Sequence, residues 1–370
     1  MSAAQTSAKP TPLYEIHQEL GATLVDFAGH MMPLRYGSET AEHQAVRTKA
    51  GLFDLSHMGE IFLSGPGAAD ALDYALVGHL SALQVGRARY TMICDAAGGV
   101  LDDLIVYRLA PETFMVVANA ANVATVRSAL TERAANFKVA LDDRSGSYAL
   151  IAVQGPSAQQ ILAELTAAPL PDLKYYAIMA GRVAGIDALI ARTGYTGEDG
   201  FELFVTASDA VPMWQELAQA PELAPAGLSA RDTLRLEAGM PLYGNELSIE
   251  TTPYDAGLGR VVKLDKPGDF VGRAALAARA ETPDGRTLVG LVARGRRVPR
   301  QGYDVVSSDG TPCGVVTSGA PSPTLAKPIA MAYLNSGYSG GTDTVDLAVD
   351  VRGKREPVDV VGLPFYRRPS

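Results

Sequence analysis

The sequence predicts an α+β protein with antiparallel sheets and a separate β-rich domain at its C-terminal end. Strand-like runs alternate with helical ones, and turns join strands into hairpins as often as helices connect them. The 370 residues exceed the length at which a single hydrophobic core usually stops growing. Near residue 283 the helical signals give way to short apolar runs separated by Gly and Pro. These observations predict a tail at 1–12 and two units, 13–282 and 283–370.

In the first unit we expect strands that are separated by turns and helices. Pro66 favours the start of a helix, where its missing N–H costs nothing, and Asn122 is expected to cap a helix that runs to about residue 136. Ala96 to Gly99 predict the turn of a hairpin. The expected strands are 59–65, 88–95, 100–109, 113–118, 138–141 and 148–154, and another helix begins at Pro156.

The second unit is expected to form a small barrel or sandwich, because several short strands follow one another at close spacing. The predicted strands are 287–293, 303–308, 314–317, 329–334 and 344–349.

Composition and motifs exclude several classes of function. A net charge of −9 disfavours nucleic acid as a partner, because an acidic surface repels phosphates. Two cysteines, Cys94 and Cys313, cannot form a disulfide scaffold or a four-Cys zinc site, and the five His residues lack zinc-binding spacing, so no metal is expected. No Gly-rich nucleotide motif, secretory signal or membrane-spanning stretch occurs. We therefore expect a cytoplasmic protein with no membrane partner.

Asp102 and Asp103 interrupt the apolar run from Val100 to Val106. Neighbouring residues of a strand point to opposite faces, so one of the two carboxylates is expected on the covered face of its sheet. A buried, unpaired carboxylate costs on the order of several kcal/mol and requires a partner, a raised pKa or a ligand. The alternative is an edge strand on which both carboxylates are solvated.

The segment from Arg192 to Glu202 predicts a loop that can follow a ligand closely, since it has three glycines among polar residues. Glu202 then lies in the apolar strand 201–205. The alternative is a surface hairpin with one isolated acid.

The segment from Ser229 to Glu237 predicts a capped helix with Arg231 in its first turn. Arg231 is suited to bind a carboxylate through two hydrogen bonds. The alternative is a surface ion pair with Asp232 or Glu237.

Two further features have mainly structural interpretations. His57 is expected to be a packed or hydrogen-bonded structural residue. A basic cluster, Arg294, Arg296, Arg297 and Arg300, is expected on a solvated face; a site for an acidic partner or a polyglutamate tail is the alternative.

Taken in order along the chain, several segments resemble one family, the T-protein (aminomethyltransferase) of the glycine cleavage system. The ordered set is far more specific than any one segment. The matching segments are Thr11–Tyr14, Val25–Gly29, Met32–Leu34, Phe53–Glu60, Gly98–Val106, Asn119–Ala120, Gln154–Pro156, Arg192–Glu202, Ala226–Glu237, Gly314–Leu325 with Lys327, and Pro364–Tyr366.

The resemblance implies a three-part cloverleaf with tetrahydrofolate at its centre, in which 13–282 forms two intertwined α+β subdomains and 283–370 forms a β-barrel. It implies that an aminomethyl group arrives on the dihydrolipoyl arm of H-protein, the protein partner. Tetrahydrofolate, the co-substrate, accepts the methylene carbon, which gives 5,10-methylenetetrahydrofolate and ammonia. No metal is needed, because the lipoyl sulfur and the folate amine carry the chemistry.

The resemblance also assigns roles to particular residues. Asp103 matches the essential acid, which holds the reduced pterin near N5 and N10. Glu202 matches an acceptor for the donor-rich edge of the pterin, and Arg231 matches the residue near the glutamate carboxylate of the folate. The remaining implied folate contacts are Met58, Tyr90, Asn119, Tyr195 and Tyr366.

The chain departs from the family pattern at a few positions. Asp255 stands where Glu is frequent, Arg260 stands where an aromatic residue is frequent, and the match at Tyr366 and Arg367 is loose. One alternative is a demethylase of the same superfamily, although the segment 192–202 is intact. Another is a folate-binding protein of iron–sulfur cluster assembly, but the comparable segment from Lys266 to Arg273 lacks its Cys.

Overall fold

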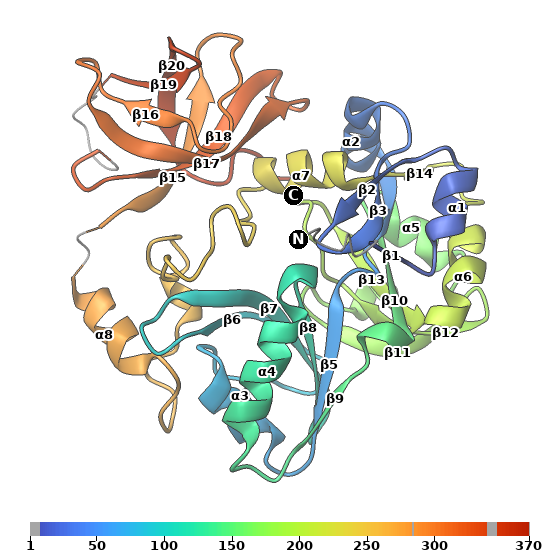
Figure 1. Cartoon of the computed structure of the whole chain (residues 1–370). Coiled ribbons are helices and arrows are strands. Elements are labelled where there is room, and N and C mark those ends of the chain that lie inside the picture. Colours follow the sequence, from blue (N-terminus) through green and yellow to red (C-terminus); the bar gives the residue numbers. More distant parts are fainter. Residues whose placement is uncertain (1–7, 283–284, 339–345, 370) are drawn as a thin grey trace, which may run out of the picture.

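The computed structural model describes residues 8–282, 285–338 and 346–369 and shows three lobes around a common centre (Figure 1). Two lobes are built on sheets of five and six strands, and the third is a closed barrel. This arrangement confirms the predicted α+β class with a C-terminal barrel. The expected boundary at residue 283 lies outside the described residues.

The first lobe is an antiparallel sheet in the order β6-β7-β8-β5-β9, with two helices on one face. Ile61 and Leu63 pack against these helices, while Phe62 between them faces the second sheet. Its elements are β5 (Gly59–Ser64), α3 (Ala68–Ala75), β6 (Ala88–Cys94), β7 (Val100–Ala110), β8 (Thr113–Ala118), α4 (Val123–Ala134) and β9 (Ala140–Asp143).

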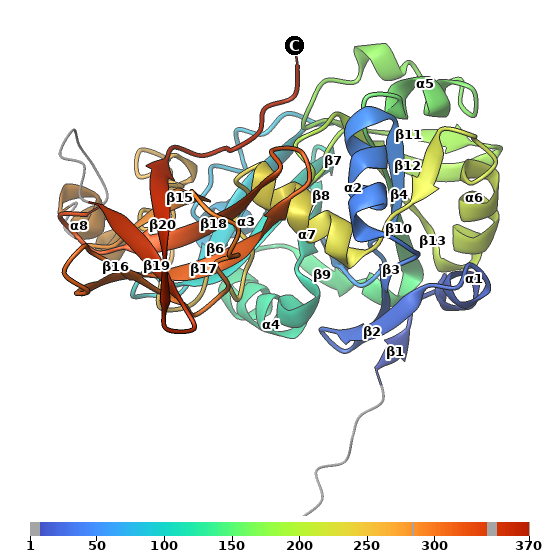
Figure 2. The same cartoon turned by 90° about the horizontal axis from the view of Figure 1, so that it is seen from above.

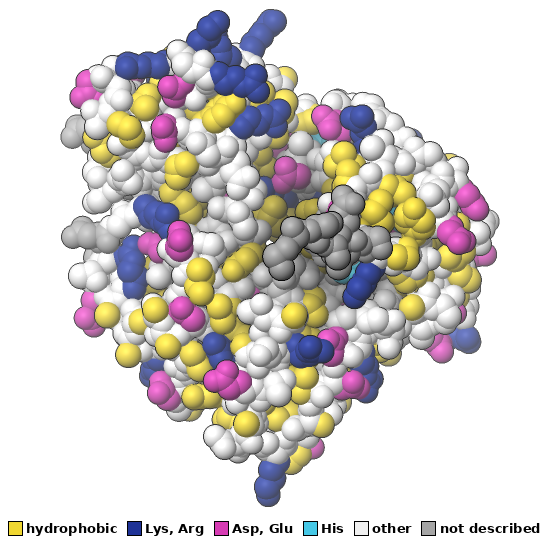
Figure 3. Space-filling view, in the orientation of Figure 1, with side chains coloured by type: hydrophobic (Ala, Val, Ile, Leu, Met, Phe, Trp, Pro, Cys, Tyr) yellow, Lys and Arg dark blue, Asp and Glu magenta, His cyan; other side chains and the backbone are white. Residues whose placement is uncertain are grey.

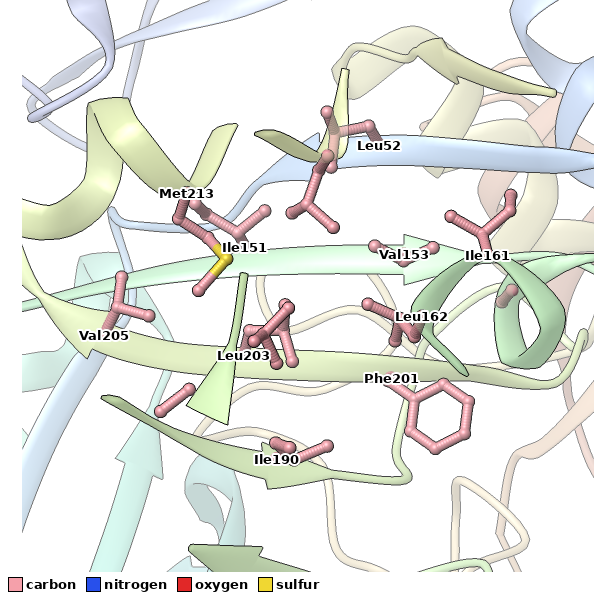
Figure 4. Packing of buried hydrophobic residues seen from close by; sticks show 14 of the residues in the cluster. Leu52, Ile151, Val153, Ile161, Leu162, Ile190, Phe201, Leu203, Val205 and Met213 are labelled. Carbon is pink, nitrogen blue, oxygen red and sulfur yellow. The ribbon is translucent and has the colours of Figure 1, made fainter. Parts of the chain in front are cut away.

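The second lobe is a six-stranded sheet in the order β11-β12-β13-β10-β4-β14. Ile151 and Val153 of its central strand pack with Leu203 in a core beneath α5 and α6 (Figure 4). Its elements are α1 (Tyr14–Glu19), β4 (Ala50–Asp54), β10 (Tyr148–Gln154), α5 (Ala158–Ala163), β11 (Ile178–Val183), β12 (Ile186–Ala191), β13 (Gly200–Thr206), α6 (Ala210–Leu217) and β14 (Leu223–Pro225).

The chain passes from one lobe to the other between consecutive strands, because β4 belongs to the second sheet and β5 to the first. Leu150, Phe62 and Phe204 belong to one apolar cluster between the sheets. Two helices complete this region, α2 (Glu39–Thr48) and α7 (Leu228–Glu237), and α7 lies near the centre of the molecule (Figure 1).

The N-terminal segment expected to be a loose tail joins the fold from Lys9 onward. β1 (Lys9–Pro10) pairs in parallel with β3 (His30–Arg35), which also pairs with β2 (Thr23–Phe27). The buried Thr11 hydroxyl donates to Asp54 Oδ2 at 2.8 Å. Expecting a free tail through Pro12 was therefore wrong, because these residues have long-range partners that local composition does not reveal; residues 1–7 lie outside the described residues.

The barrel closes through its strands in the order β15-β18-β17-β16-β19-β20, with β20 pairing with β15 (Figure 2). The strand predicted from residue 344 begins at Leu347, and residues 344 and 345 lie outside the described residues. The strand β20 was missed because Lys354 to Pro357 are charged or lack an N–H. The barrel strands are β15 (Thr287–Ala293), β16 (Asp304–Val306), β17 (Pro312–Ser322), β18 (Lys327–Leu334), β19 (Leu347–Val351) and β20 (Lys354–Val361). The helix α8 (Arg273–Glu281) precedes them and packs against the first sheet through Leu276.

The basic cluster is exposed on the barrel, where Lys and Arg side chains gather (Figure 3). Arg294 pairs with Asp359 at 2.8 Å, and Arg297 lies 3.4 Å from Glu356. This placement agrees with the solvated face expected for the cluster.

Short 3-10 helices connect several of these elements: η1 (Ala120–Asn122), η2 (Ser145–Ser147), η3 (Leu170–Asp172), η4 (Ala207–Asp209) and η5 (Gly259–Val261). Within the described part of the chain, no helix is long and apolar enough to cross a membrane.

Asn122 occupies the predicted N-cap position of α4 but makes no side-chain cap bond, and the capped start predicted for α7 was wrong. The Asn122 side chain does not cap α4; it donates to Asp102 Oδ1 at 2.7 Å. The residue that precedes the first turn of α7 is Gly227, and it makes no side-chain cap. A longer-range hydrogen bond therefore replaces the local one at Asn122.

Candidate functional site

A cavity of about 650 Å³ lies between the two sheets and α7. This volume is within the range of small-molecule sites. Its walls come from both sheets, the β2–β3 hairpin, the start of α7 and the segment 239–245. Seven of the eight sequence-predicted residues line it: Met58, Tyr90, Asp103, Asn119, Tyr195, Glu202 and Arg231.

The eighth predicted residue, Tyr366, does not line the cavity. Its ring lies 4.0 Å from the guanidinium carbon of Arg47, and its N–H donates to the Glu237 carbonyl at 2.8 Å. We therefore remove Tyr366 from the candidate folate contacts. Its loose sequence match was the only signal that had suggested this role.

The acid pair divides between the two faces of its strand, as the alternation of β7 requires. Asp102 is fully buried and accepts hydrogen bonds from Asn119 and Asn122. Asp103 faces the cavity, where its Oδ2 accepts from the Tyr90 hydroxyl at 3.1 Å and its Oδ1 from Asn119 Nδ2 at 2.9 Å. Because β7 is an inner strand, the alternative of a solvated edge was wrong.

The environment makes both carboxyl groups weaker acids than usual. Burial raises the pKa of Asp103 to about 6, against the opposing effect of hydrogen bonds from Tyr90 and Asn119. Burial, helped by the charge of Asp103, raises the pKa of Asp102 to about 7. At neutral pH Asp103 is thus mainly ionised, with a proton affinity close to that of a general base or acid.

Glu202 lies on β13, buried at the opposite wall. It accepts hydrogen bonds from the hydroxyls of Thr193 and, at 3.4 Å, Tyr107. Burial raises its pKa, while the Thr193 hydrogen bond and the nearby Arg231 charge lower it. The alternative of a surface hairpin with an isolated acid was therefore wrong.

Arg231, in the first turn of α7, presents a cation to the cavity. Its guanidinium carbon lies 4.7 Å from the centre of the Tyr195 ring. Burial lowers its pKa, and it forms no ion pair with any residue in the described ranges. The surface ion pair considered as an alternative is therefore absent there, and Asp232 pairs instead with Arg235 at 2.8 Å.

Two cavity residues had no predicted role in ligand binding. His57 was expected to be structural, but it lines the cavity, and burial together with the Arg231 charge lowers its pKa to about 3. Tyr176 lines the cavity with φ 58°, an uncommon conformation for an aromatic residue. Backbone hydrogen bonds with Arg192 and Ala88 hold it there. The motif around His57 was a usable signal, whereas no local signal marks Tyr176.

The cavity combines charged groups with apolar and aromatic walls. Carboxylates that only accept hydrogen bonds suit a ligand rich in N–H donors. An unpaired guanidinium suits a carboxylate or phosphate. The aromatic rings of Tyr90, Tyr176 and Tyr195 provide flat surfaces between them. Together these groups fit a planar, donor-rich ring that carries an anionic tail.

Comparison with known proteins agrees with this geometry. The model of the GCVT N-terminal domain matches residues 13–266, and that of the glycine cleavage T-protein C-terminal barrel domain matches residues 286–367. An aminomethyltransferase of Saccharopolyspora erythraea is 62% identical over 367 residues, covering 98% of this chain and 99% of that protein. An aminomethyltransferase of Streptomyces avermitilis is also 62% identical, over 371 residues and 99% of each chain.

A crystal structure of the glycine cleavage system aminomethyltransferase T from Bartonella henselae superposes with a TM-score of 0.92. The two chains are 37% identical, and the match covers 98% of this chain and 99% of that one. The likeness thus extends over both sheets and the barrel. This chain belongs to the glycine cleavage T-protein family.

Proposed function

We propose that this chain is the aminomethyltransferase of a glycine cleavage system and transfers a methylene group to tetrahydrofolate. The observation that carries the proposal is the cavity itself, which is lined by Asp103, Glu202 and Arg231, an arginine without an ion pair among the described residues. This set matches the two ends of a reduced folate, a pterin rich in N–H groups and a glutamate carboxylate.

At the pterin end, Glu202 is the acceptor for the N–H donors of the ring. The hydroxyls of Thr193 and Tyr107 already hold its carboxylate in place. Met58 and the ring of Tyr90 pack beside the pterin, and Asn119 adds a polar contact. Preorganised partners of this kind orient a bound ligand before reaction.

At the other end, Arg231 binds the glutamate carboxylate. It lines the cavity with its guanidinium carbon 4.7 Å from the Tyr195 ring centre, and a guanidinium can stack on an aromatic face while its N–H groups bind a carboxylate. A charge-assisted hydrogen bond in such a buried place is stronger than one in water.

Asp103 is the acid–base group of the proposed reaction. Two C–N bonds to the folate form while the C–N bond to the amino group and the C–S bond to the lipoyl arm break. The two folate N–H protons leave with ammonia and with the thiol, so the carbon is neither oxidised nor reduced. A carboxylate whose pKa is about 6 is suited to accept such a proton and release it.

The proposal includes lipoylated H-protein as the partner that delivers the aminomethyl group, and no metal takes part in the chemistry. The cytoplasmic location expected from the sequence is part of the same proposal.

The direct test is formation of 5,10-methylenetetrahydrofolate from aminomethyl-loaded H-protein, with sarcosine and a sulfonium compound offered in parallel. We expect turnover with loaded H-protein only. Turnover with sarcosine or the sulfonium compound alone would favour a demethylase. Folate binding without any turnover, together with iron–sulfur cluster defects in a deletion strain, would favour the non-enzymatic alternative.

A further inference from the structure

Arg47, in the last turn of α2, does not line the cavity but contacts two of its walls. Its Nη1 donates to the Thr196 carbonyl at 2.7 Å and to Glu198 Oε1 at 2.8 Å. Its Nε and Nη2 donate to Glu237 Oε2 at 3.1 and 2.9 Å. The side chain is only 6% exposed, so these bonds form away from solvent.

Arg47 joins the loop that carries Tyr195 to the helix that carries Arg231, the residue that we assign to the folate tail. The loop that contains Thr196 and Glu198 also contains Tyr195, and the helix that ends at Glu237 contains Arg231. Tyr195 and Arg231 meet in the cavity with 4.7 Å between ring centre and guanidinium carbon. A shift of the loop along the helix would therefore change this contact directly.

The loop also packs closely against the residues that follow the helix. Gly197 has φ 82°, and a Cβ at that position would lie 2.9 Å from Cβ of Ala238, just beyond the helix. The Tyr195 hydroxyl donates to the Pro241 carbonyl in the segment that follows. The loop and the end of the helix are thus in close contact, and Arg47 adds a cation that bonds to both.

The same hydrogen-bonded group reaches the barrel. Glu237 Oε1 accepts from the Ser322 hydroxyl and from the Thr324 N–H at 3.1 Å. The Tyr366 ring covers Arg47 from the C-terminal segment. The barrel thus contacts the site through Glu237 and Arg47, although no described barrel residue lines the cavity.

We propose that Arg47 is a positioning residue that holds the Tyr195 loop against the Arg231 helix and thereby sets the affinity for the carboxylate end of the folate. This inference rests on the proposed function, since it assigns Arg231 to the folate tail. A guanidinium is required because its planar fork serves both sides at once, whereas the ammonium of Lys is a point charge on a flexible stem.

The test is a double-mutant cycle of Arg47→Lys and Arg231→Ala, read as the tetrahydrofolate Kd by calorimetry. Measurements are made at a temperature where circular dichroism shows each variant folded. Arg47→Lys keeps a cation between Glu198 and Glu237, and we expect about a tenfold rise in Kd from the misplaced loop. In the Arg231→Ala background the same change should alter Kd by less than about twofold.

Arg133→Lys is the matched control, because Arg133 also bonds to two separate segments, through the Ala75 and Cys94 carbonyls at 2.8 Å, but lies outside the cavity. Its Kd should equal that of the wild type. Should Arg47→Lys fail to fold, Glu198→Gln weakens only the loop side and should show a smaller loss with the same dependence on Arg231.

Three results would overturn the inference: an unchanged Kd in folded Arg47→Lys, an equal loss in Arg133→Lys, or a tenfold loss that persists without Arg231. A wild-type protein that does not bind tetrahydrofolate would instead refute the proposed function, so the two failures are distinguishable.

Discussion

The cavity between the two sheets and the interior of the barrel are both buried, but they are filled with different kinds of side chain. The barrel core is an apolar cluster that includes the fully buried Leu291, Val305 and Leu334, and the buried carboxylate of the barrel, Glu356, is paired with Arg297. The cavity is lined by the charged side chains of Asp103, Glu202 and Arg231. Burying charge costs free energy unless a partner compensates, so incompletely paired charges in a folded protein indicate a binding site.

Arg231 and Arg235, one turn apart on α7, differ in the same way, because only one of them is paired with carboxylates. Arg235 is fully paired, with Asp232, with Glu246 at 2.9 Å and with Ser318 Oγ at 2.7 Å. Arg231 faces the cavity and has no such ion pair within the described part of the chain. Arg235 therefore stabilises the junction with the barrel, whereas Arg231 is available for a ligand. We therefore expect substitutions in the cavity to affect function and substitutions in the barrel core to affect stability.

Asp103→Asn should produce the largest effect, a loss of about 10²–10⁴ in rate, because it removes the only proposed acid–base group. The fold should persist, since Asn keeps the shape of the side chain between Tyr90 and Asn119. Turnover with loaded H-protein and the thermal midpoint are the measurements. Asp102→Asn is the comparison and should cost less rate; the reverse order would contradict the assignment of faces.

Leu291→Ala should lower the free energy of unfolding by about 2–5 kcal/mol, the usual cost of a cavity in an apolar core. Chemical denaturation measures this loss, and the tetrahydrofolate Kd of the folded protein should not change. Val360→Ala, at a position 42% exposed on β20, is the control and should have little effect. A large change in Kd from Leu291→Ala would break the division between barrel and cavity.

Arg231→Ala should weaken tetrahydrofolate binding by about 1.5–3 kcal/mol, the value of a hydrogen bond to a charged group. The free energy of unfolding should not fall, because the variant removes a buried cation without an ion partner. Calorimetry and thermal denaturation separate the two quantities. Arg127→Ala, on the exposed side of α4, is the control, and an unchanged affinity in Arg231→Ala would refute the role of Arg231.

The rate should depend on the ionisation of Asp103. Its pKa of about 6 predicts that kcat/KM is nearly constant above that pH and falls about tenfold per pH unit below it, as the carboxylate becomes protonated. The profile should shift in the folate complex if the ligand changes the burial of Asp103. An acidic limb near pH 4 in the free enzyme would show that Asp103 titrates as an ordinary carboxyl group.

The smallest expected effect concerns Glu60 on β5, a buried acid that does not line the cavity. Burial, together with the Asp143 charge, raises its pKa to about 8, and neither carboxyl oxygen has a hydrogen-bond partner among the described residues. Because the folded pKa exceeds the usual 4.5, the contribution of Glu60 to the free energy of unfolding is greatest below pH 4.5 and falls as pH rises towards 8.

Glu60→Gln should remove this dependence. Its stability relative to the wild type should rise by about 1–2 kcal/mol between pH 5 and pH 6. Denaturant unfolding at several pH values measures the difference. Parallel pH profiles for the two proteins would show that Glu60 is not a neutral buried acid.

Local pattern alone determined much of the secondary structure. The strands 113–118, 148–154 and 287–293 occur with the predicted bounds, because continuous runs of β-branched and other apolar residues specify buried strands whatever surrounds them. Because side chains alternate along a strand, the adjacent positions of Asp102 and Asp103 also predicted that one of the two faces the covered side of its sheet. The ordered motifs predicted the family and seven residues that line the cavity.

Only the tertiary structure decided which polar groups meet. Asn122 bonds to Asp102 instead of capping α4, Tyr366 covers Arg47 outside the cavity, and Tyr176 enters the cavity with a left-handed backbone. Each of these contacts joins residues far apart in sequence, and its free energy depends on burial and on partners that a local window does not contain. Local sequence therefore predicts elements and candidate residues, whereas long-range packing determines which of them form the site.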